Sequence, residues 1–165
     1  MMIPRSEPSD SRAHRFTTRL ASSTPGIWFM RNVGTRLDPT LVRLSRGRLS
    51  CVAPFHALVL THTGARSGIS RTSTVVYFTD RGRVIVIASN FGSPQNPSWY
   101  YNVKANPLVT LDGGCFRGRF VAEEITGTER DRLFGLVRGA ASPYGHYQGI
   151  AGKRSIPVVA FIPAS

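Results

Sequence analysis

The sequence lacks the motifs that mark enzymes whose own side chains carry out the chemistry. It has no HExxH, CxxC or GxSxG segment, so zinc-protease, dithiol and α/β-hydrolase chemistry are not indicated. Its four histidines are too dispersed to indicate a metal site. Nothing in the spacing of the two cysteines, Cys51 and Cys115, suggests a redox motif, so free thiols are expected. If this protein is an enzyme, a bound cofactor must supply the reactive atom.

Long apolar runs are absent as well. No segment approaches the ~18 consecutive apolar residues of a membrane-spanning helix, and the polar N-terminus lacks the apolar core of a signal peptide. A cytoplasmic location is therefore predicted. The 165 residues, 41% of them hydrophobic, suit one folded domain. We expect residues 1–23 to form a mobile basic tail and residues 24–165 to form that domain.

Acidic residues are few, and the formal net charge is +12. Only two of the 21 basic residues, Lys104 and Lys153, are lysine, which leaves 19 arginines. Arginine binds phosphate and carboxylate through two parallel hydrogen bonds and stacks on flat rings. Residues 1–50 hold nine arginines and three acids and so carry +6 of the charge. The balance indicates nucleic acid, anionic lipid or an acidic ligand tail as partner, unless it reflects only a compositional bias toward arginine.

Short β-type runs dominate the chain after residue 57, with Asp80-Arg81-Gly82 and Asp112-Gly113-Gly114 as hairpin turns between them. The expected strands are Leu58–Thr63, Thr72–Phe78, Val84–Ala88, Leu108–Leu111, Phe116–Ile125 and Ile156–Ile162. A parallel sheet would need a helix between successive strands, and the first three have none. The pattern predicts a mainly β (α+β) fold, a small and mostly antiparallel barrel.

A few helices should flank this barrel. Helix starts stand at Thr24-Pro25, Asp38-Pro39 and Asn96-Pro97, and Thr126–Glu129 has the spacing of a capping box. Gly139–Gly152 is interpreted as a loop that carries Tyr144 and Tyr147. Pro157 should be the first residue of its strand or lie on an edge strand.

The segment Gly64–Arg71 is the strongest candidate for an anion site. Its two glycines allow close backbone approach, Arg66 and Arg71 offer guanidinium groups, and Ser67 offers a hydroxyl. It is neither a Walker loop nor a dinucleotide fingerprint, because a strand follows it. A solvated basic hairpin loop explains these residues equally well.

Two further groups of residues could border a flat ligand. A polar loop that begins Ser89-Asn90-Phe91-Gly92 follows the third strand, and Trp99 lies in the aromatic segment after it. Taken alone, the first is typical of an ordinary loop and the second of a core. Tyr144 and Tyr147, if exposed in their loop, would be placed to close over a site and donate a proton.

In these segments the chain resembles the deazaflavin-dependent nitroreductase family of actinobacteria, split β-barrel oxidoreductases that use coenzyme F-420 (an 8-hydroxy-5-deazaflavin). The shared pattern stands here loosely at Leu60–Tyr77, at Val86–Pro107 as VIASNFGSPQNPSWYYNVKANP, at Pro143–Gln148 as PYGHYQ, and at Ile156–Val159 as IPVV. The resemblance spans roughly Leu41 to Pro163. It implies a split antiparallel barrel of the flavin-reductase or pyridoxamine-oxidase-like type.

The resemblance also implies roles for individual residues. Arg66, Ser67 and Arg71 would hold the phosphate of the coenzyme tail. Ser89, Asn90, Gly92, Trp99 and Asn102 would lie near the deazaflavin ring. Tyr147, Tyr144 and Ser89, in that order, would be the proton or hydrogen-bond donors to the substrate. Some family members have Lys and Tyr where Asn90 and Ala141 stand here, which bears on nitroimidazole reduction rather than on coenzyme binding.

The implied reaction is hydride transfer from the reduced coenzyme to a quinone, an activated enone or a nitroaromatic. Three alternatives remain at this point: a coenzyme carrier without turnover, a split barrel that binds flavin mononucleotide, and a basic nucleic-acid binder. The last lacks the interleaved aromatic and basic strand pattern of RNA-recognition modules. The N-terminal arginines could steer the coenzyme or hold the protein peripherally on the inner membrane face. A homodimer is possible under each of these hypotheses.

Overall fold

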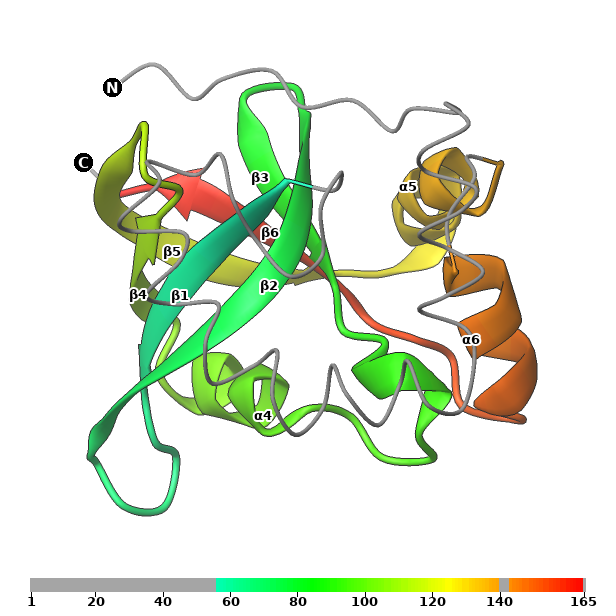
Figure 1. Cartoon of the computed structure of the whole chain (residues 1–165), viewed down its shortest axis with the longest axis horizontal. Coiled ribbons are helices and arrows are strands. Elements are labelled where there is room, and N and C mark those ends of the chain that lie inside the picture. The colour runs from blue at the N-terminus through cyan, green and yellow to red at the C-terminus, as the bar shows by residue number, and fades with distance from the viewer. Residues whose placement is uncertain (1–55, 140–142, 165) are drawn as a thin grey trace.

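The computed structural model describes residues 56–139 and 143–164 (Figure 1). The predicted basic tail, the two upstream helix starts and Cys51 lie outside the described residues. Cys115 is a free, exposed thiol, as expected.

Six antiparallel strands close into one barrel in the order β1-β2-β3-β6-β5-β4. They are β1 (Ala57–Thr63), β2 (Ser70–Asp80), β3 (Arg83–Ile87), β4 (Leu108–Asp112), β5 (Arg117–Ile125) and β6 (Val158–Pro163). The predicted turn at Arg81-Gly82 joins β2 to β3, with both residues at positive φ (50° and 77°) as a tight hairpin turn requires. The prediction of a small antiparallel barrel is confirmed.

Closure of the barrel corrects one expectation about its last strand. β6 pairs with β3 on one side and with β5 on the other, so it is not an edge strand. Pro157 lies just before β6, where its missing N–H costs no ladder hydrogen bond, and its carbonyl accepts from Ala88 N at 2.9 Å.

Within the described residues, four helical segments flank the barrel: η2 (Asn90–Gly92), α4 (Ser98–Ala105), α5 (Gly127–Gly139) and α6 (Tyr144–Ile150). The interpretation of Gly139–Gly152 as a loop was wrong, because Tyr144 to Ile150 form α6. Burial of Tyr147 against the barrel stabilises this short helix in spite of Gly145 and Gly149. The helix start predicted from the capping-box spacing is confirmed, because α5 begins at Gly127, and Glu129 also accepts from Arg83 Nη2 at 2.6 Å.

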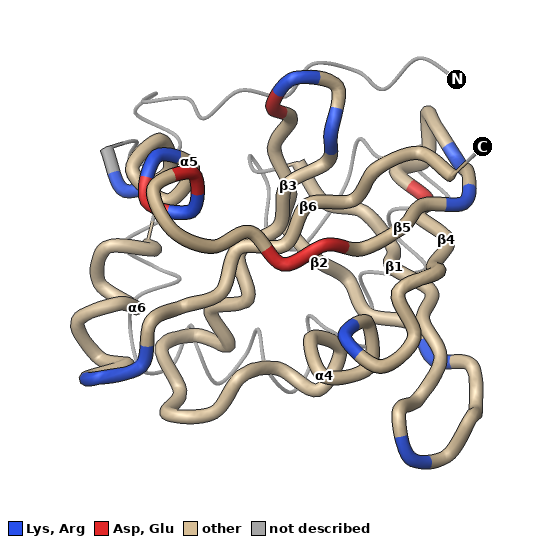
Figure 2. Tube along the Cα trace, turned by 180° about the vertical axis from the view of Figure 1, so that it is seen from behind, with Lys and Arg blue, Asp and Glu red and all other residues tan. Residues whose placement is uncertain are grey.

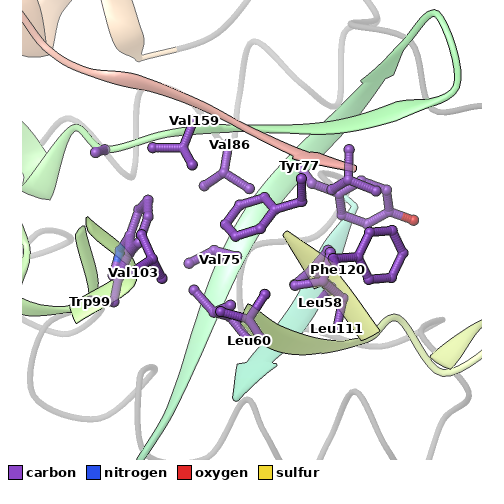
Figure 3. Close-up of a cluster of buried hydrophobic side chains, with 14 of the residues drawn as sticks. Leu58, Leu60, Val75, Tyr77, Val86, Trp99, Val103, Leu111, Phe120 and Val159 are labelled. Carbon is purple, nitrogen blue, oxygen red and sulfur yellow. The ribbon is translucent and has the colours of Figure 1, made fainter. Parts of the chain in front are cut away.

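Two apolar layers hold the barrel together. The inner one fills the barrel itself (Figure 3) and includes Leu58, Leu60, Tyr77, Phe120 and Phe161. The outer one lies between the strands and helices α5 and α6. β3 and β6 contribute to both layers, with alternate residues facing inward and outward, which explains why their sequences are almost continuously apolar.

The elements that carry the predicted site residues gather along one side of the barrel. In Figure 1 the β1–β2 loop, α4 and α6 follow one another along the lower edge of the view. Direct contacts join these elements: Ala65 N donates to Asn102 Oδ1 of α4 at 2.9 Å, and Gly92 of η2 packs against α6.

Candidate functional site

The β1–β2 loop has a defined backbone conformation. Gly64 N donates to the carbonyl of Ile69 at 2.9 Å, and Gly68 N donates to the carbonyl of Gly64 at 2.8 Å. Ile69 N donates to Ser67 Oγ at 3.3 Å. Gly68 has a φ of 67°, a conformation that favours glycine. These bonds keep residues 65–69 in a compact turn on the protein surface.

Two of the predicted anion-binding side chains converge over Gly64. A Cβ atom built on Gly64 would lie 2.5 Å from Ser67 Oγ and 3.4 Å from Arg71 Nε. Only glycine fits there without moving a neighbour. Arg71 lies in β2 rather than in the loop, because β2 begins at Ser70, two residues earlier than predicted. The strand therefore fixes the backbone of Arg71, while Arg66 and Ser67 belong to the turn.

The arginines of this loop are among the basic residues that have no carboxylate partner in the described part of the chain. Arg66 and Arg71 are exposed, and neither pairs with a carboxylate of residues 56–139 or 143–164. Arg83 and Arg132 bind Asp80 and Glu129, and Lys104 binds Glu124. Figure 2 shows the loop with basic but no acidic positions, whereas the acidic residues lie on other elements. The loop is thus positively charged, with no compensating carboxylate in the described part of the chain.

Asn102 and His62 anchor this loop to the barrel. Asn102 Oδ1 accepts from Ala65 N at 2.9 Å, and Asn102 Nδ2 lies 3.1 Å from His62 Nδ1. His62 Nε2 lies 3.1 Å from Ser73 Oγ in β2. His62 is only 4% exposed, and burial, followed by the positive charge of Arg71, lowers the pKa of its imidazole. The network ties β1, β2 and α4 to the loop.

His62 was not among the residues predicted from the sequence to form the site. The signal was present, since His62 continues the inward-facing alternation of Leu58 and Leu60 along β1. A histidine at a buried strand position needs hydrogen-bond partners. Asn102, predicted to lie near the coenzyme ring, uses its side-chain amide for this network.

The loop after β3 holds the predicted ring-side residues in an unusual backbone. Asn90 and Phe91 have φ of 47° and 54°, and Gly92 has 74°. Two consecutive non-glycine residues in the left-handed region store conformational strain. Asn90 Nδ2 donates to the carbonyl of Gln95 at 2.9 Å, and Gly92 N donates to that of Ser89 at 3.0 Å. Ser89 precedes η2, and its hydroxyl does not cap that turn.

Arg154, which was not predicted from the sequence, holds the loop after β3 through hydrogen bonds. Its guanidinium donates to the carbonyl of Ser89 at 2.8 Å, to that of Ala88 at 3.4 Å and to Asn96 Oδ1 at 2.5 Å. Gln148 of α6 in turn donates to the Arg154 carbonyl at 2.7 Å. No local sequence signal joins Arg154 to residues more than fifty positions earlier, so only the fold could disclose this contact.

Tyr144 and Tyr147 lie one helical turn apart on α6, with their rings edge to face and the centroids 6.2 Å apart. Tyr147 also meets Phe91, at a centroid distance of 6.0 Å. The expectation of exposed loop aromatics was wrong for Tyr147, which is 3% exposed, whereas Tyr144 is half-buried. Burial raises the pKa of Tyr147 to about 12, and burial together with Tyr147 raises that of Tyr144. Both phenols stay protonated at neutral pH and can donate hydrogen bonds.

Trp99 and Gly92 are both buried. Trp99 is 8% exposed and belongs to the inner core with Val103 (Figure 3). A Cβ on Gly92 would lie 3.0 Å from the carbonyl oxygen of Tyr147 and from Ile150 Cβ. Gly92 therefore allows η2 and α6 to meet closely, and both predicted ring neighbours are buried rather than on the surface.

Within residues 56–139 and 143–164, no group of three or more His, Cys, Asp or Glu side chains is arranged to hold a metal ion. In the same part of the chain, no helix has both the length and the apolar character needed to cross a membrane.

Known proteins resemble the chain over most of its length. A family model described as F420H(2)-dependent quinone reductase matches residues 35–163. An F420H(2)-dependent quinone reductase of Mycobacterium tuberculosis is 34% identical over 140 residues, which are 80% of this chain and 93% of that protein.

Two solved structures are similar in fold and in sequence. One, described as an F420-H2 dependent reductase, has a TM-score of 0.57 and 37% identity over 64% of this chain and 92% of its own. The other, described as a domain-swapped dimer, has a TM-score of 0.60 and 32% identity over 84% of this chain and 99% of its own. Together with the strand order, these likenesses confirm the predicted split-barrel class.

Proposed function

The chain belongs to the F420H(2)-dependent quinone reductase family, and from this premise we propose that it reduces a quinone-type acceptor at the expense of reduced coenzyme F-420. One observation supports coenzyme binding most directly. Two arginines without carboxylate partners in the described chain, Arg66 and Arg71, lie with Ser67 around the glycine turn at Gly64. The phosphodiester and glutamyl tail of the coenzyme is the kind of anion that this group suits.

The residues of the site fit the coenzyme in two parts. Arg66, Ser67 and Arg71 would bind the phosphate, and the loop backbone can approach it closely at Gly64. Ser89 and Asn90, at the end of β3, would border the deazaflavin ring. Trp99, Gly92 and Asn102 would act indirectly, by packing or by holding the loops in place. The whole set agrees with the net charge of +12 and with a flat, anionic ligand.

When bound, reduced F-420 would supply a hydride to a planar acceptor. The protein contributes orientation, exclusion of water and a donor for the negative charge that develops on the acceptor oxygen. Tyr147, Tyr144 and Ser89 are the proposed donors. Both phenols are neutral donors at pH 7 because burial raises their pKa. Tyr144 is half-buried and Tyr147 is buried, and their rings meet edge to face, so each helps to hold the other in place.

The test is turnover of reduced F-420 by purified protein with a panel of quinones, enones and nitroaromatics. Oxidation that needs both protein and acceptor is the expected result. Tight binding without oxidation under any acceptor would instead indicate a carrier. A bound chromophore with the absorbance of flavin mononucleotide would indicate the other split-barrel chemistry, and loss of all F-420 binding at moderate salt would leave only electrostatic attraction.

Two further properties belong to this proposal. We expect the net charge of +6 on residues 1–50 to bring the cytoplasmic protein to an anionic membrane surface, where quinones are found. Comparing sedimentation of the protein with anionic vesicles and with neutral vesicles measures this binding. A homodimer is expected because a solved relative is described as a domain-swapped dimer. Light scattering during gel filtration gives the mass.

A further inference from the structure

The side-chain amide of Asn102 links the anion-binding loop to a buried histidine. Its oxygen accepts from the backbone N–H of Ala65 at 2.9 Å, and its nitrogen lies 3.1 Å from His62 Nδ1. An amide has an acceptor on one branch and donors on the other. A backbone N–H can only donate, so it requires the oxygen of Asn102. The NH₂ group of Asn102 must then face His62.

This orientation determines the protonation state of His62. An NH₂ group facing Nδ1 needs an unprotonated nitrogen there, so the proton of the neutral imidazole lies on Nε2. From Nε2 it is donated to Ser73 Oγ, 3.1 Å away. Protonation of Nδ1 would bring two donors together, and rotation of Asn102 to relieve this would place its NH₂ group against Ala65 N–H. No orientation of Asn102 satisfies both neighbours once His62 is an imidazolium.

We propose that His62 is a positioning residue for coenzyme binding: neutral His62 holds Asn102, Asn102 holds the β1–β2 loop, and protonation of His62 releases that loop and weakens binding. The inference rests on the proposed function of the loop as the phosphate site. The surroundings favour the neutral form. β2 presents the positive Arg71, the cross-strand partner of His62, and α4 presents the uncharged Asn102. Burial and Arg71 together lower the pKa of His62.

The network itself can be tested without coenzyme. In wild-type protein at pH 7.5, ¹⁵N NMR of the imidazole should show an Nε2-protonated tautomer for His62, and hydrogen exchange should show protection of the Ala65 amide. His62→Leu, which removes the acceptor, should lose that protection. His62→Asn, which keeps a carbonyl oxygen near the position of Nδ1, should retain most of it. An Nδ1-protonated tautomer in the wild type would overturn the proposal, and this measurement needs no variant to fold.

Burial and Arg71 hold the pKa of His62 below its usual value, and an NMR titration of the imidazole measures where it lies. The binding test compares F-420 dissociation constants at pH 7.5 and at an acidic pH below that measured pKa. Because the coenzyme has titrating groups of its own, the informative quantity is the difference between wild type and His62→Asn at each pH. On acidification, the affinity of the wild type should fall about three- to tenfold more than the affinity of His62→Asn. This is the range expected for the loss of one hydrogen bond when water can take the place of the lost partner. His62→Leu should bind three- to tenfold more weakly at pH 7.5.

The control is His56→Asn, an exposed histidine outside the network, which should follow the wild type at both pH values. Identical pH dependence in wild type and His62→Asn, with the Nε2 tautomer present, would refute the coupling of His62 to the coenzyme while leaving coenzyme binding intact. If wild-type protein does not bind F-420 at all, the proposed function itself fails, and the tautomer and exchange results still decide whether the network exists.

Discussion

Replacing Arg71 by alanine should weaken F-420 binding without unfolding the barrel. Arg71 is exposed at the start of β2, and its Nε lies over Gly64 beside Ser67 Oγ. Loss of a hydrogen bond from a charged donor to an anion costs about 1.5–3 kcal/mol, which is roughly a 10- to 150-fold rise in Kd. Because Arg71 is exposed to solvent and salt, we expect the lower half of that range.

The assay is a titration with F-420 that follows tryptophan fluorescence at about 0.15 M salt and again at higher salt. Arg119→Ala is the matched control, since Arg119 is also an exposed strand arginine but lies on β5. Its affinity should change less than twofold. Unchanged binding in Arg71→Ala would remove this loop from the site. Equal losses in Arg71→Ala and Arg119→Ala would mean that only the overall positive charge attracts the coenzyme, with no defined phosphate site.

Tyr147→Phe should lower turnover about 10- to 100-fold while the Kd for F-420 changes less than threefold, because a donor used in the transition state affects the rate more than binding. Equal losses in steady-state rate and affinity would argue for a structural role. Gly92→Ala should lower the free energy of unfolding in urea by about 1–3 kcal/mol, because φ is 74° and the new Cβ meets the carbonyl of Tyr147. Gly82 has a similar φ but open space around it, so Gly82→Ala should lower the free energy of unfolding by less. A loss in Gly92→Ala no larger than that in Gly82→Ala would contradict the packing argument. Asp80→Asn should destabilise by about 1–2 kcal/mol at pH 7 and by little at pH 2. The hydrogen bond from Arg132 holds the pKa of the Asp80 carboxyl below its usual value, so its contribution is present above about pH 4 and is lost as pH falls through the lowered pKa; a difference between the proteins that does not shrink in acid would refute this.

Much of the barrel followed from local sequence patterns. Each strand of the described chain was predicted within a few residues, because alternating apolar residues and turn signals such as Arg81-Gly82 act over short distances. The errors came from competing local signals. The glycines of α6 suggested a loop, yet burial of Tyr147 stabilises a helix there. The spacing at Thr126–Glu129 did mark the start of α5, whereas the pairing of Glu129 with Arg83 at 2.6 Å depends on the barrel.

The sequence alone determined the strands, the cationic glycine turn at Gly64–Arg71 and the family resemblance, because these depend on residues close together in the chain. Only the tertiary structure decided which residues support that turn. His62 meets Asn102 across forty positions, and Arg154 reaches the carbonyl of Ser89 across sixty-five. Closure of the barrel creates these contacts, and buried polar groups must then find partners wherever the fold has placed them. The roles of His62 and Arg154 therefore belong to the fold, although each residue is visible in the sequence.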